Sequence, residues 1–277
     1  MPPSPPNCKP PQSILIIGGG RGIGLEIVKY LMQSKRQVVV ITAFDKSFEW
    51  SEDDIIPYVG NVVTIVQGDV TLAEDRARVL QKSSNFKGID TLIYCAGIIT
   101  PIKRIEKLDI NDVKMTFDVN VFGAMEMSRL CLPFLRKSRI AHPLNTGHGK
   151  IIILSSACDS DVTYHGWSPY CTTKAALTRF ISCLAHEEPL VSVQGVYPKL
   201  TRTKMPEDVI AGKYDGVMAD HEVERFRIWD EMGDEMVEPP EWCGEAVAKL
   251  ALGLFEGGKS GETLYYDEHV PKKITGT

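Results

Sequence analysis

The sequence SILIIGGGRGIG, residues 13–24, decides the fold of this chain. Ile14 to Ile17 form a short aliphatic run that predicts a buried strand, and the residues after Gly24 have apolar side chains at helical spacing. Glycines between a strand and a helix let the backbone turn sharply and approach a pyrophosphate closely. The free N–H groups at the start of the helix would then bind the phosphate charge. A plain glycine-rich turn is the alternative, but at the first strand of a chain this pattern favours dinucleotide binding.

Strand-like and helix-like segments alternate along the rest of the chain. Strands are predicted at residues 38–42, 62–66, 89–94, 151–154, 191–197 and 262–266, and helices at about 72–83, 111–137, from 169 onward and at 241–255. This alternation predicts an α/β fold of the Rossmann type, a doubly wound sheet of about seven parallel strands with helices on both faces.

The length of 277 residues suits a single domain. We expect residues 1–12 to be a flexible proline-rich tail and residues 13–277 to form one nucleotide-binding domain. Within it, residues 201–238 are polar and irregular; a surface excursion would explain them, but a mobile substrate lid is the favoured interpretation.

Composition argues against several classes of partner. The chain has 31 basic and 36 acidic residues, so no basic excess indicates binding to nucleic acid. It has no run of 18 apolar residues, which argues against a membrane span. Its seven cysteines lack the spacing of metal ligands. We therefore expect reduced thiols, no metal site and a cytoplasmic protein.

A second stretch, IIILSSACDSDVTYHGWSPYCTTK at residues 151–174, carries the candidate chemistry. Ser156 lies just past a predicted strand. Ser168 is a good helix N-cap and Pro169 suits the first helical position, so Tyr170 should lie in the first turn of a helix.

Lys174 lies four residues after Tyr170 and should project from the same face of that helix. A tyrosine has a pKa near ~10, and a lysine ammonium beside it would lower that pKa toward neutrality. The Ser156 hydroxyl could hold a substrate carbonyl oxygen against the phenol, with Ser155 as the weaker alternative. The Tyr-Lys spacing also arises by chance on amphipathic helices, but the glycine loop favours a catalytic pair.

These segments together resemble the short-chain dehydrogenase/reductase family, from Ser13 to about Asp267. The resemblance implies catalytic roles for Asn120, Ser156, Tyr170 and Lys174. It also implies cofactor contacts at the positions that match the family's motifs: Gly18, Gly20, Arg21, Gly22, Ile23, Gly24, Phe44, Asp69, Val70, Cys95, Ala96, Gly97, Asn120, Tyr170, Lys174, Pro198 and Thr203. Asn120 would hold a water that links Lys174 to solvent.

The chain departs from the family pattern at several residues. Ile17 replaces a threonine that supports the glycine loop, Tyr94-Cys95 replaces two asparagines, and Lys199 replaces a glycine beside the nicotinamide. None of these changes removes a residue of the implied catalytic set.

The resemblance implies an NAD(P)H-dependent oxidoreductase that reduces a ketone or dicarbonyl, with Tyr170 as proton donor. The sequence around Tyr170 is most similar to that of fungal and bacterial reductases of the sepiapterin and benzil reductase type. NADP(H) is the preferred cofactor and NAD(H) the alternative. Phe44 stands where an arginine that selects NADP(H) is usual, but Arg21 could reach the 2′-phosphate. Asp45 could instead bind the ribose hydroxyls, which would favour NAD(H). Relatives imply a homodimer or homotetramer.

Two other functions remain open at this point. One is an NAD-dependent alcohol dehydrogenase that works in the oxidative direction. The other is a cofactor-sensing scaffold that binds NADP(H) without turnover.

Overall fold

The structure is a computed structural model that describes residues 11–84, 88–138 and 148–270. The predicted proline-rich tail falls almost entirely outside these ranges, and the first strand begins at Gln12.

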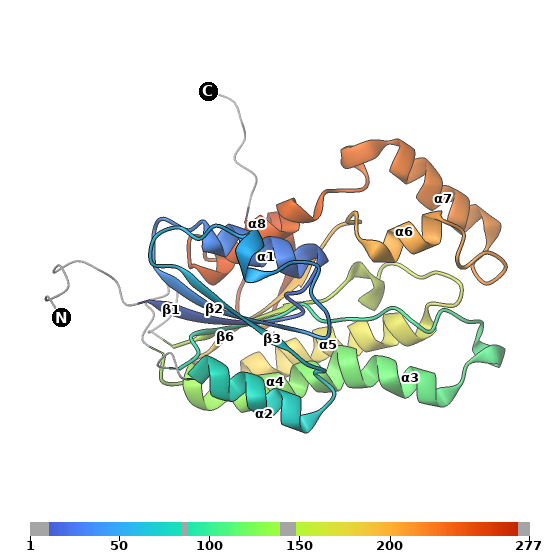
Figure 1. The fold of residues 1–277 in the computed structure, drawn as a ribbon. Coiled ribbons are helices and arrows are strands. Elements are labelled where there is room, and N and C mark those ends of the chain that lie inside the picture. Colours follow the sequence, from blue (N-terminus) through green and yellow to red (C-terminus); the bar gives the residue numbers. More distant parts are fainter. Residues whose placement is uncertain (1–10, 85–87, 139–147, 271–277) are drawn as a thin grey trace, which may run out of the picture.

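A single sheet of parallel strands organises the described residues (Figure 1). Its strands follow the order β3-β2-β1-β4-β5-β6-β7, and every neighbouring pair is parallel. The predicted Rossmann-type fold is therefore confirmed. The strands are β1 (Gln12–Ile17), β2 (Val39–Asp45), β3 (Val62–Gln67), β4 (Thr91–Tyr94), β5 (Lys150–Leu154), β6 (Ser192–Tyr197) and β7 (Thr263–Tyr265).

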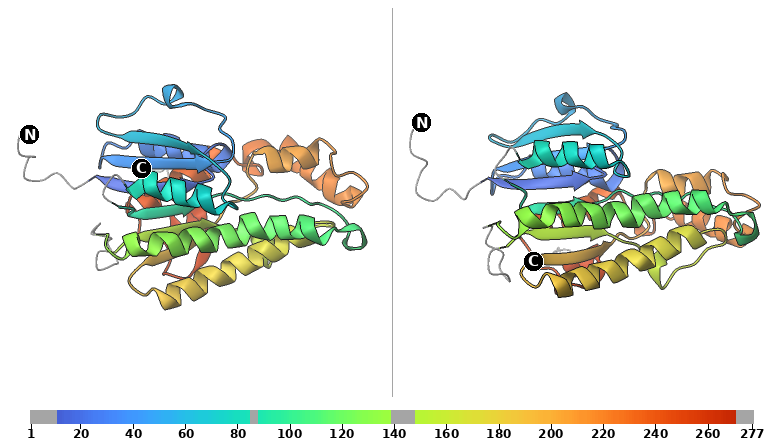
Figure 2. Two further views of the ribbon diagram at one scale, coloured as in Figure 1. Left: turned by 60° about the horizontal axis from the view of Figure 1, so that its bottom comes forward. Right: turned by 90° about the horizontal axis from the view of Figure 1, so that it is seen from below.

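Helices cover both faces of this sheet (Figures 1 and 2). One face carries α1 (Gly22–Met32), α8 (Pro240–Ala251) and the short α9 (Tyr266–His269). The other carries α2 (Ala73–Ser84), α4 (Gly123–Leu135) and α5 (Ser168–Glu187).

The aliphatic strands account for this layering. In β1, Ile14 and Ile16 pack into the core beneath α1 and α8, whereas Leu15 and Ile17 pack into the core beneath α4 and α5. Successive strand residues point to opposite faces, so a strand covered on both sides must be apolar throughout.

The predicted helix at residues 111–137 is divided in the structure. α3 (Ile110–Phe117) passes into a π-helical segment, Asp118–Phe122, before α4 begins at Gly123. Asn120 lies in this segment. Short π-helical turns inside longer helices occur frequently at functional sites.

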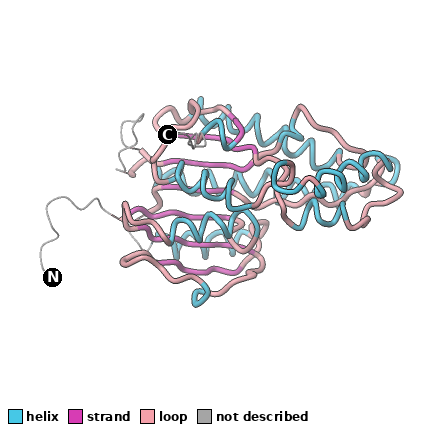
Figure 3. The backbone as a smooth tube through the Cα atoms, turned by 90° about the horizontal axis from the view of Figure 1, so that it is seen from above, coloured by secondary structure: helices cyan, strands magenta, loops and turns pink. Residues whose placement is uncertain are grey.

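Residues 201–238 form an excursion beyond the carboxyl ends of the strands (Figures 1 and 3). They contain α6 (Lys204–Ile210) and α7 (Asp220–Glu231). Thr201 and Glu238 pair as a parallel bridge at the base, and the Arg202 N–H donates to the Glu238 carbonyl at 2.8 Å. The excursion thus leaves and rejoins the domain at one point.

Candidate active site

Ser156 and Tyr170 come together where β5 ends and α5 begins. Ser156 is the N-cap of a short 3₁₀ turn, Ala157–Asp159, and its Oγ accepts a hydrogen bond from the Cys158 N–H at 3.2 Å. That turn packs against α5. The Ser156 hydroxyl is also hydrogen-bonded to the Tyr170 hydroxyl.

The local sequence explains how Tyr170 is positioned. α5 begins at Ser168 with Trp167 as its N-cap, one residue earlier than the sequence predicted, and Pro169 lies in the first turn. The Tyr170 side chain is buried and meets the Trp167 ring edge-on, with 5.9 Å between ring centroids.

The pKa of Tyr170 differs from the expectation. Burial raises this pKa, and the hydrogen bond from Ser156 lowers it by less. We expected Lys174 to lower it. The Lys174 ammonium instead lies 5.6 Å from the centre of the Tyr170 ring and donates to the Leu154 carbonyl at 2.9 Å. The phenol is therefore protonated around neutral pH.

Lys174 itself has an unusual electrostatic setting. Its side chain is only 5 % exposed, and burial lowers the pKa of the ammonium to about 8. Perturbed lysines in partly enclosed sites are candidates for a functional role.

The side-chain amide of Asn120 is fully paired in the structure. Its Oδ1 accepts from the Ile98 N–H at 2.8 Å, and its Nδ2 donates to the Ile98 carbonyl at 2.9 Å and to Thr173 Oγ1 at 3.0 Å. Asn120 thus connects the loop after β4 to α5. Its partner on α5, Thr173, is the residue before Lys174. Sequence reasoning did not identify Thr173 as its partner.

The glycine loop closes tightly against the end of β4. Gly18 has a φ of +88°, and a Cβ at this position would lie 2.5 Å from the Ala96 nitrogen. The N–H groups of Cys95 and Ala96 donate to the Ile17 carbonyl at 2.7 and 3.0 Å. Only glycine provides this conformation and approach.

The start of α1 is suited to an anionic group. Arg21 occupies the N-cap position without a side-chain capping bond, and the first turn of the helix contains no acidic residue. A Cβ on Gly22 would lie 3.5 Å from the Thr203 methyl group, so Thr203 faces the loop from the other side. Uncapped N–H groups at a helix start fit a pyrophosphate, and the residues present therefore fit a dinucleotide.

Gly97 connects this loop to the candidate catalytic residues. A Cβ there would lie 3.5 Å from Asn120 Oδ1 and 3.8 Å from Lys174 Nζ. The fold therefore brings the ends of β1, β4 and β5 and the start of α5 to one edge of the sheet, as expected for a doubly wound fold.

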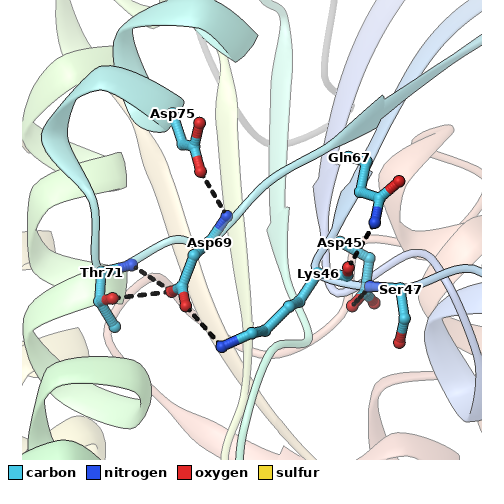
Figure 4. Close-up of polar contacts among 7 residues, drawn as sticks. All are labelled: Asp45, Lys46, Ser47, Gln67, Asp69, Thr71 and Asp75. Atoms are coloured by element: carbon cyan, nitrogen blue, oxygen red, sulfur yellow. Dashed lines mark hydrogen bonds and ion pairs between the residues drawn. The ribbon is translucent and has the colours of Figure 1, made fainter.

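A charged cluster lies at the other end of this edge, between β2 and β3 (Figure 4). Asp69 accepts hydrogen bonds from the Thr71 N–H at 2.9 Å and hydroxyl at 2.7 Å, and from Lys46 Nζ at 2.8 Å. Partial burial opposes ionisation of Asp69, but these hydrogen bonds outweigh it and lower its pKa.

The Asp45 carboxylate is hydrogen-bonded to backbone N–H groups of the neighbouring loops. It accepts from the Gly20 N–H at 2.9 Å and from the Ser47 N–H at 3.3 Å. Lys46, a basic residue directly after this aspartate at the end of a strand, is a signal that sequence reasoning missed.

The predicted end of the strand before Phe44 requires a correction. β2 extends to Asp45, so Phe44 lies inside the strand and not after it. Its ring is 1 % exposed and packs in the core with Val70. Both side chains are buried, and the contacts of Phe44 and Val70 with a cofactor stay predictions.

Lys199, which follows Pro198 at the end of β6, is also engaged elsewhere. Its ammonium is paired with Asp267 and lies 5.8 Å from the centre of the Tyr266 ring. The Lys199 ammonium therefore interacts with residues in the C-terminal part of the domain.

Ser155, the weaker serine candidate, is buried against α5. Its hydroxyl lies 2.8 Å from Thr178 Oγ1. Ser156 is therefore the serine that reaches Tyr170.

No helix within the three described ranges is long and apolar enough to cross a membrane.

Comparison with known proteins places the chain in a family. Residues 12–213 match the model of the short chain dehydrogenase family. The chain belongs to this family and is an oxidoreductase.

Two proteins and one crystal structure illustrate the similarity to this family. A benzil reductase ((S)-benzoin forming) of Saccharomyces cerevisiae is 30% identical over 268 residues, which cover 92% of this chain and 95% of that protein. An uncharacterized oxidoreductase of the same yeast is 27% identical over 259 residues, with the same coverage of both chains. A crystal structure of a short chain dehydrogenase/reductase from this yeast aligns with a TM-score of 0.82 at 26% identity, covering 92% of this chain and 96% of that one.

Proposed function

We propose that this protein is an NADPH-dependent carbonyl reductase that converts a ketone or vicinal dicarbonyl into a hydroxy compound. The hydrogen bond between Ser156 and the buried, protonated Tyr170 phenol carries the proposal. A phenol that retains its proton around neutral pH is suited to donate it to a developing alkoxide, which is the direction of reduction. The benzil reductase relative supports a dicarbonyl substrate.

Each catalytic side chain would have a separate task. Bound NADPH would supply the hydride. Ser156 would hydrogen-bond the substrate carbonyl oxygen, and Tyr170 would transfer its proton to that oxygen as charge develops there. Lys174 would bind the ribose hydroxyls and place a positive charge beside the phenol, favouring the phenolate that remains. Asn120 would fix α5 relative to the loop after β4 through its bonds to Ile98 and Thr173.

The excursion at residues 201–238 would act as the substrate lid. His165, in the loop before α5, contacts Glu222 of α7 through its ring Nδ1 at 2.9 Å. Tyr164 packs on Phe226 of α7 with 5.2 Å between ring centroids. These contacts join the lid directly to the loop that leads to Tyr170, and their aromatic character favours substrates with apolar groups.

We propose NADP(H) over NAD(H) because two cations flank the expected adenosine site. Arg21 caps α1 and is exposed, and Lys46 follows β2 with an exposed ammonium. Either can reach a 2′-phosphate, while Asp45 is occupied by the N–H groups of Gly20 and Ser47.

The chain is also proposed to be a cytoplasmic homodimer or homotetramer. Three exposed apolar side chains, Met115, Phe122 and Met125, lie along α3, the π-helical segment and the start of α4. Such a row suits a helix-to-helix interface between copies. Light scattering of the purified protein tests this, and a monomer at micromolar concentration would refute it.

The decisive experiment follows the absorbance of reduced nicotinamide with the full chain, NADPH or NADH, and a panel that includes benzil. We expect dicarbonyl-dependent oxidation of NADPH in preference to NADH. Tyr170→Phe should lower kcat by about 100-fold or more because it removes the proton donor. NADPH binding, measured by fluorescence, should stay near the wild-type value, and Tyr30→Phe on α1 is the matched control.

Two results would refute the proposal. Full turnover in Tyr170→Phe would exclude the mechanism. Tight NADPH binding with no turnover on any substrate of the panel would favour the cofactor-sensing scaffold instead.

A further inference from the structure

Two cysteines flank the proposed catalytic hydroxyls. Cys158 lies two residues after Ser156, and Cys171 directly follows Tyr170. The 3₁₀ turn that carries Cys158 packs against α5, which carries Cys171. Cys158 belongs to the apolar cluster around Trp167 and Tyr170, Cys171 packs against the same cluster, and hydrogen bonding between the two thiols is the largest influence on the pKa of each.

The two thiols are not equivalent. The hydrogen bond from Cys171 lowers the pKa of Cys158 most; burial opposes this, and Ser156 and the charge of Lys174 lower the pKa further. The same contact raises the pKa of Cys171. A cysteine with a stabilised thiolate beside a second thiol is the arrangement found at reactive sites.

This pair lies nearer the surface than the cysteines of the sheet core. Cys158 is 9 % exposed, and Cys171 is partly exposed on the first turn of α5. By contrast, Cys131 is fully buried in the core, and burial raises the pKa of its thiol.

We propose that Cys158 and Cys171 form a modification site at which a hydroperoxide generates a reversible disulfide that stops catalysis. The Cys158 thiolate attacks one oxygen of hydrogen peroxide and breaks the O–O bond, which leaves a sulfenic acid and, after proton transfer, water. The Cys171 thiol then attacks the sulfenic sulfur, forming the S–S bond and releasing a second water. Two thiols are oxidised and one peroxide is reduced, so the step is balanced.

The disulfide would disturb both catalytic hydroxyls. Bonded sulfur atoms are about 2.0 Å apart, much closer than hydrogen-bonded thiols. The Cys158 N–H holds Ser156 Oγ, and Cys171 is adjacent to Tyr170, so drawing the sulfurs together moves the two hydroxyls relative to each other. A shift of about 1 Å costs on the order of 100-fold in rate. This loss of activity rests on the proposed function, whereas disulfide formation does not.

The sequence offers a clean way to test the pair. Trypsin cuts after Lys150 and Lys174 and releases residues 151–174, which contain Cys158 and Cys171 and no other cysteine. The full chain would be reduced, treated with a slight excess of hydrogen peroxide, alkylated and digested. We expect this peptide to lose both alkylatable thiols and the mass of two hydrogen atoms.

Activity would be followed in the same samples. NADPH-dependent turnover should fall about 100-fold in step with the disulfide and return with dithiothreitol. Cys171→Ser should prevent the disulfide, and Cys183→Ser, which removes an exposed thiol of the same helix, should leave both the peptide mass and the inactivation unchanged.

Each outcome decides the proposal. Two free thiols in the peptide after peroxide has abolished turnover would overturn it, and so would a complete disulfide with full turnover. If the reduced protein shows no turnover with any substrate, the proposed function fails, but the peptide mass still decides whether the thiols react as a pair.

Discussion

Lys174 and Lys46 lie at the same edge of the sheet, and their surroundings shift their pKa values in opposite directions. Lys174 on α5 is buried against the end of β5, and burial lowers its pKa to about 8. The Lys46 side chain is 79% exposed at the end of β2, and the hydrogen bond and charge of Asp69 raise its pKa. Desolvation therefore dominates at the junction of β5 and α5, and pairing with a carboxylate dominates between β2 and β3.

This contrast predicts where substitutions will matter. Charges in a buried site interact strongly because little solvent screens them, whereas an exposed ion pair is typically worth less than about 1 kcal/mol. We therefore expect large effects at the β5–α5 junction and small effects between β2 and β3.

The largest effect is expected for Lys174→Met. It removes the buried cation beside Tyr170 while keeping an apolar side chain of similar length, and kcat with NADPH should fall by about 100-fold or more. Steady-state kinetics of this variant and of Lys46→Met measure the contrast directly. Equal losses of kcat in the two variants would break the comparison.

The stability of the protein should report the buried lysine independently of activity. Between pH 8 and the ordinary lysine pKa of 10.5, native Lys174 loses its proton while the unfolded chain retains it. The unfolded state then binds more protons, so the free energy of unfolding rises with pH, by at most about 3 kcal/mol. Urea unfolding at several pH values should show this rise in the wild type and a smaller rise in Lys174→Met.

A second buried lysine serves as an internal reference. Burial lowers the pKa of Lys150, at the start of β5, to about 7, and it titrates in both proteins. The difference between the two pH profiles therefore isolates Lys174. Parallel profiles would show that Lys174 is hydrated in solution.

Tyr94 should have an intermediate effect through the π-helical segment. Its buried hydroxyl donates to the Val119 carbonyl at 2.5 Å, next to Asn120. Tyr94→Phe leaves that carbonyl without this donor, which should cost about 1–3 kcal/mol of stability, measured by urea unfolding.

Gly123 provides a coupled test of this contact. A Cβ on Gly123 would collide with the Tyr94 hydroxyl. Gly123→Ala should therefore be much less damaging in the Tyr94→Phe background than in the wild type. Additive losses would show that the hydroxyl does not lie against the helix.

The fold was predictable because it depends on local patterns. Continuous aliphatic runs such as Ile14 to Ile17, separated by helical periods, identify a parallel sheet with two covered faces. The glycine loop and the Tyr170–Lys174 spacing likewise lie within single segments of the chain, so their local order indicated the candidate site.

The features that sequence reasoning missed depend on contacts between distant segments. Asn120 meets Thr173 and Cys158 meets Cys171 only because helices pack in three dimensions. The pKa of Tyr170 was predicted in the wrong direction because spacing indicates a nearby lysine but does not reveal burial. Phe44 was placed after the second strand because the predicted end of β2 came three residues too early.

The smallest effect is expected at Lys46. If its ammonium leaves Asp69 to bind a 2′-phosphate, Lys46→Met should weaken NADPH binding several-fold and leave NADH binding unchanged, because only NADPH carries that group. The stability of the variant should change by less than about 1 kcal/mol, since the pair with Asp69 is exposed. Lys29→Met is the matched control: Lys29 is also exposed and paired, with Glu26 at 2.6 Å, but it lies in the last turn of α1, away from the loops between β2 and β3. Equal losses of NADPH and NADH affinity in Lys46→Met would assign Lys46 to the shape of the adenosine site, and the preference for NADPH would then depend on Arg21.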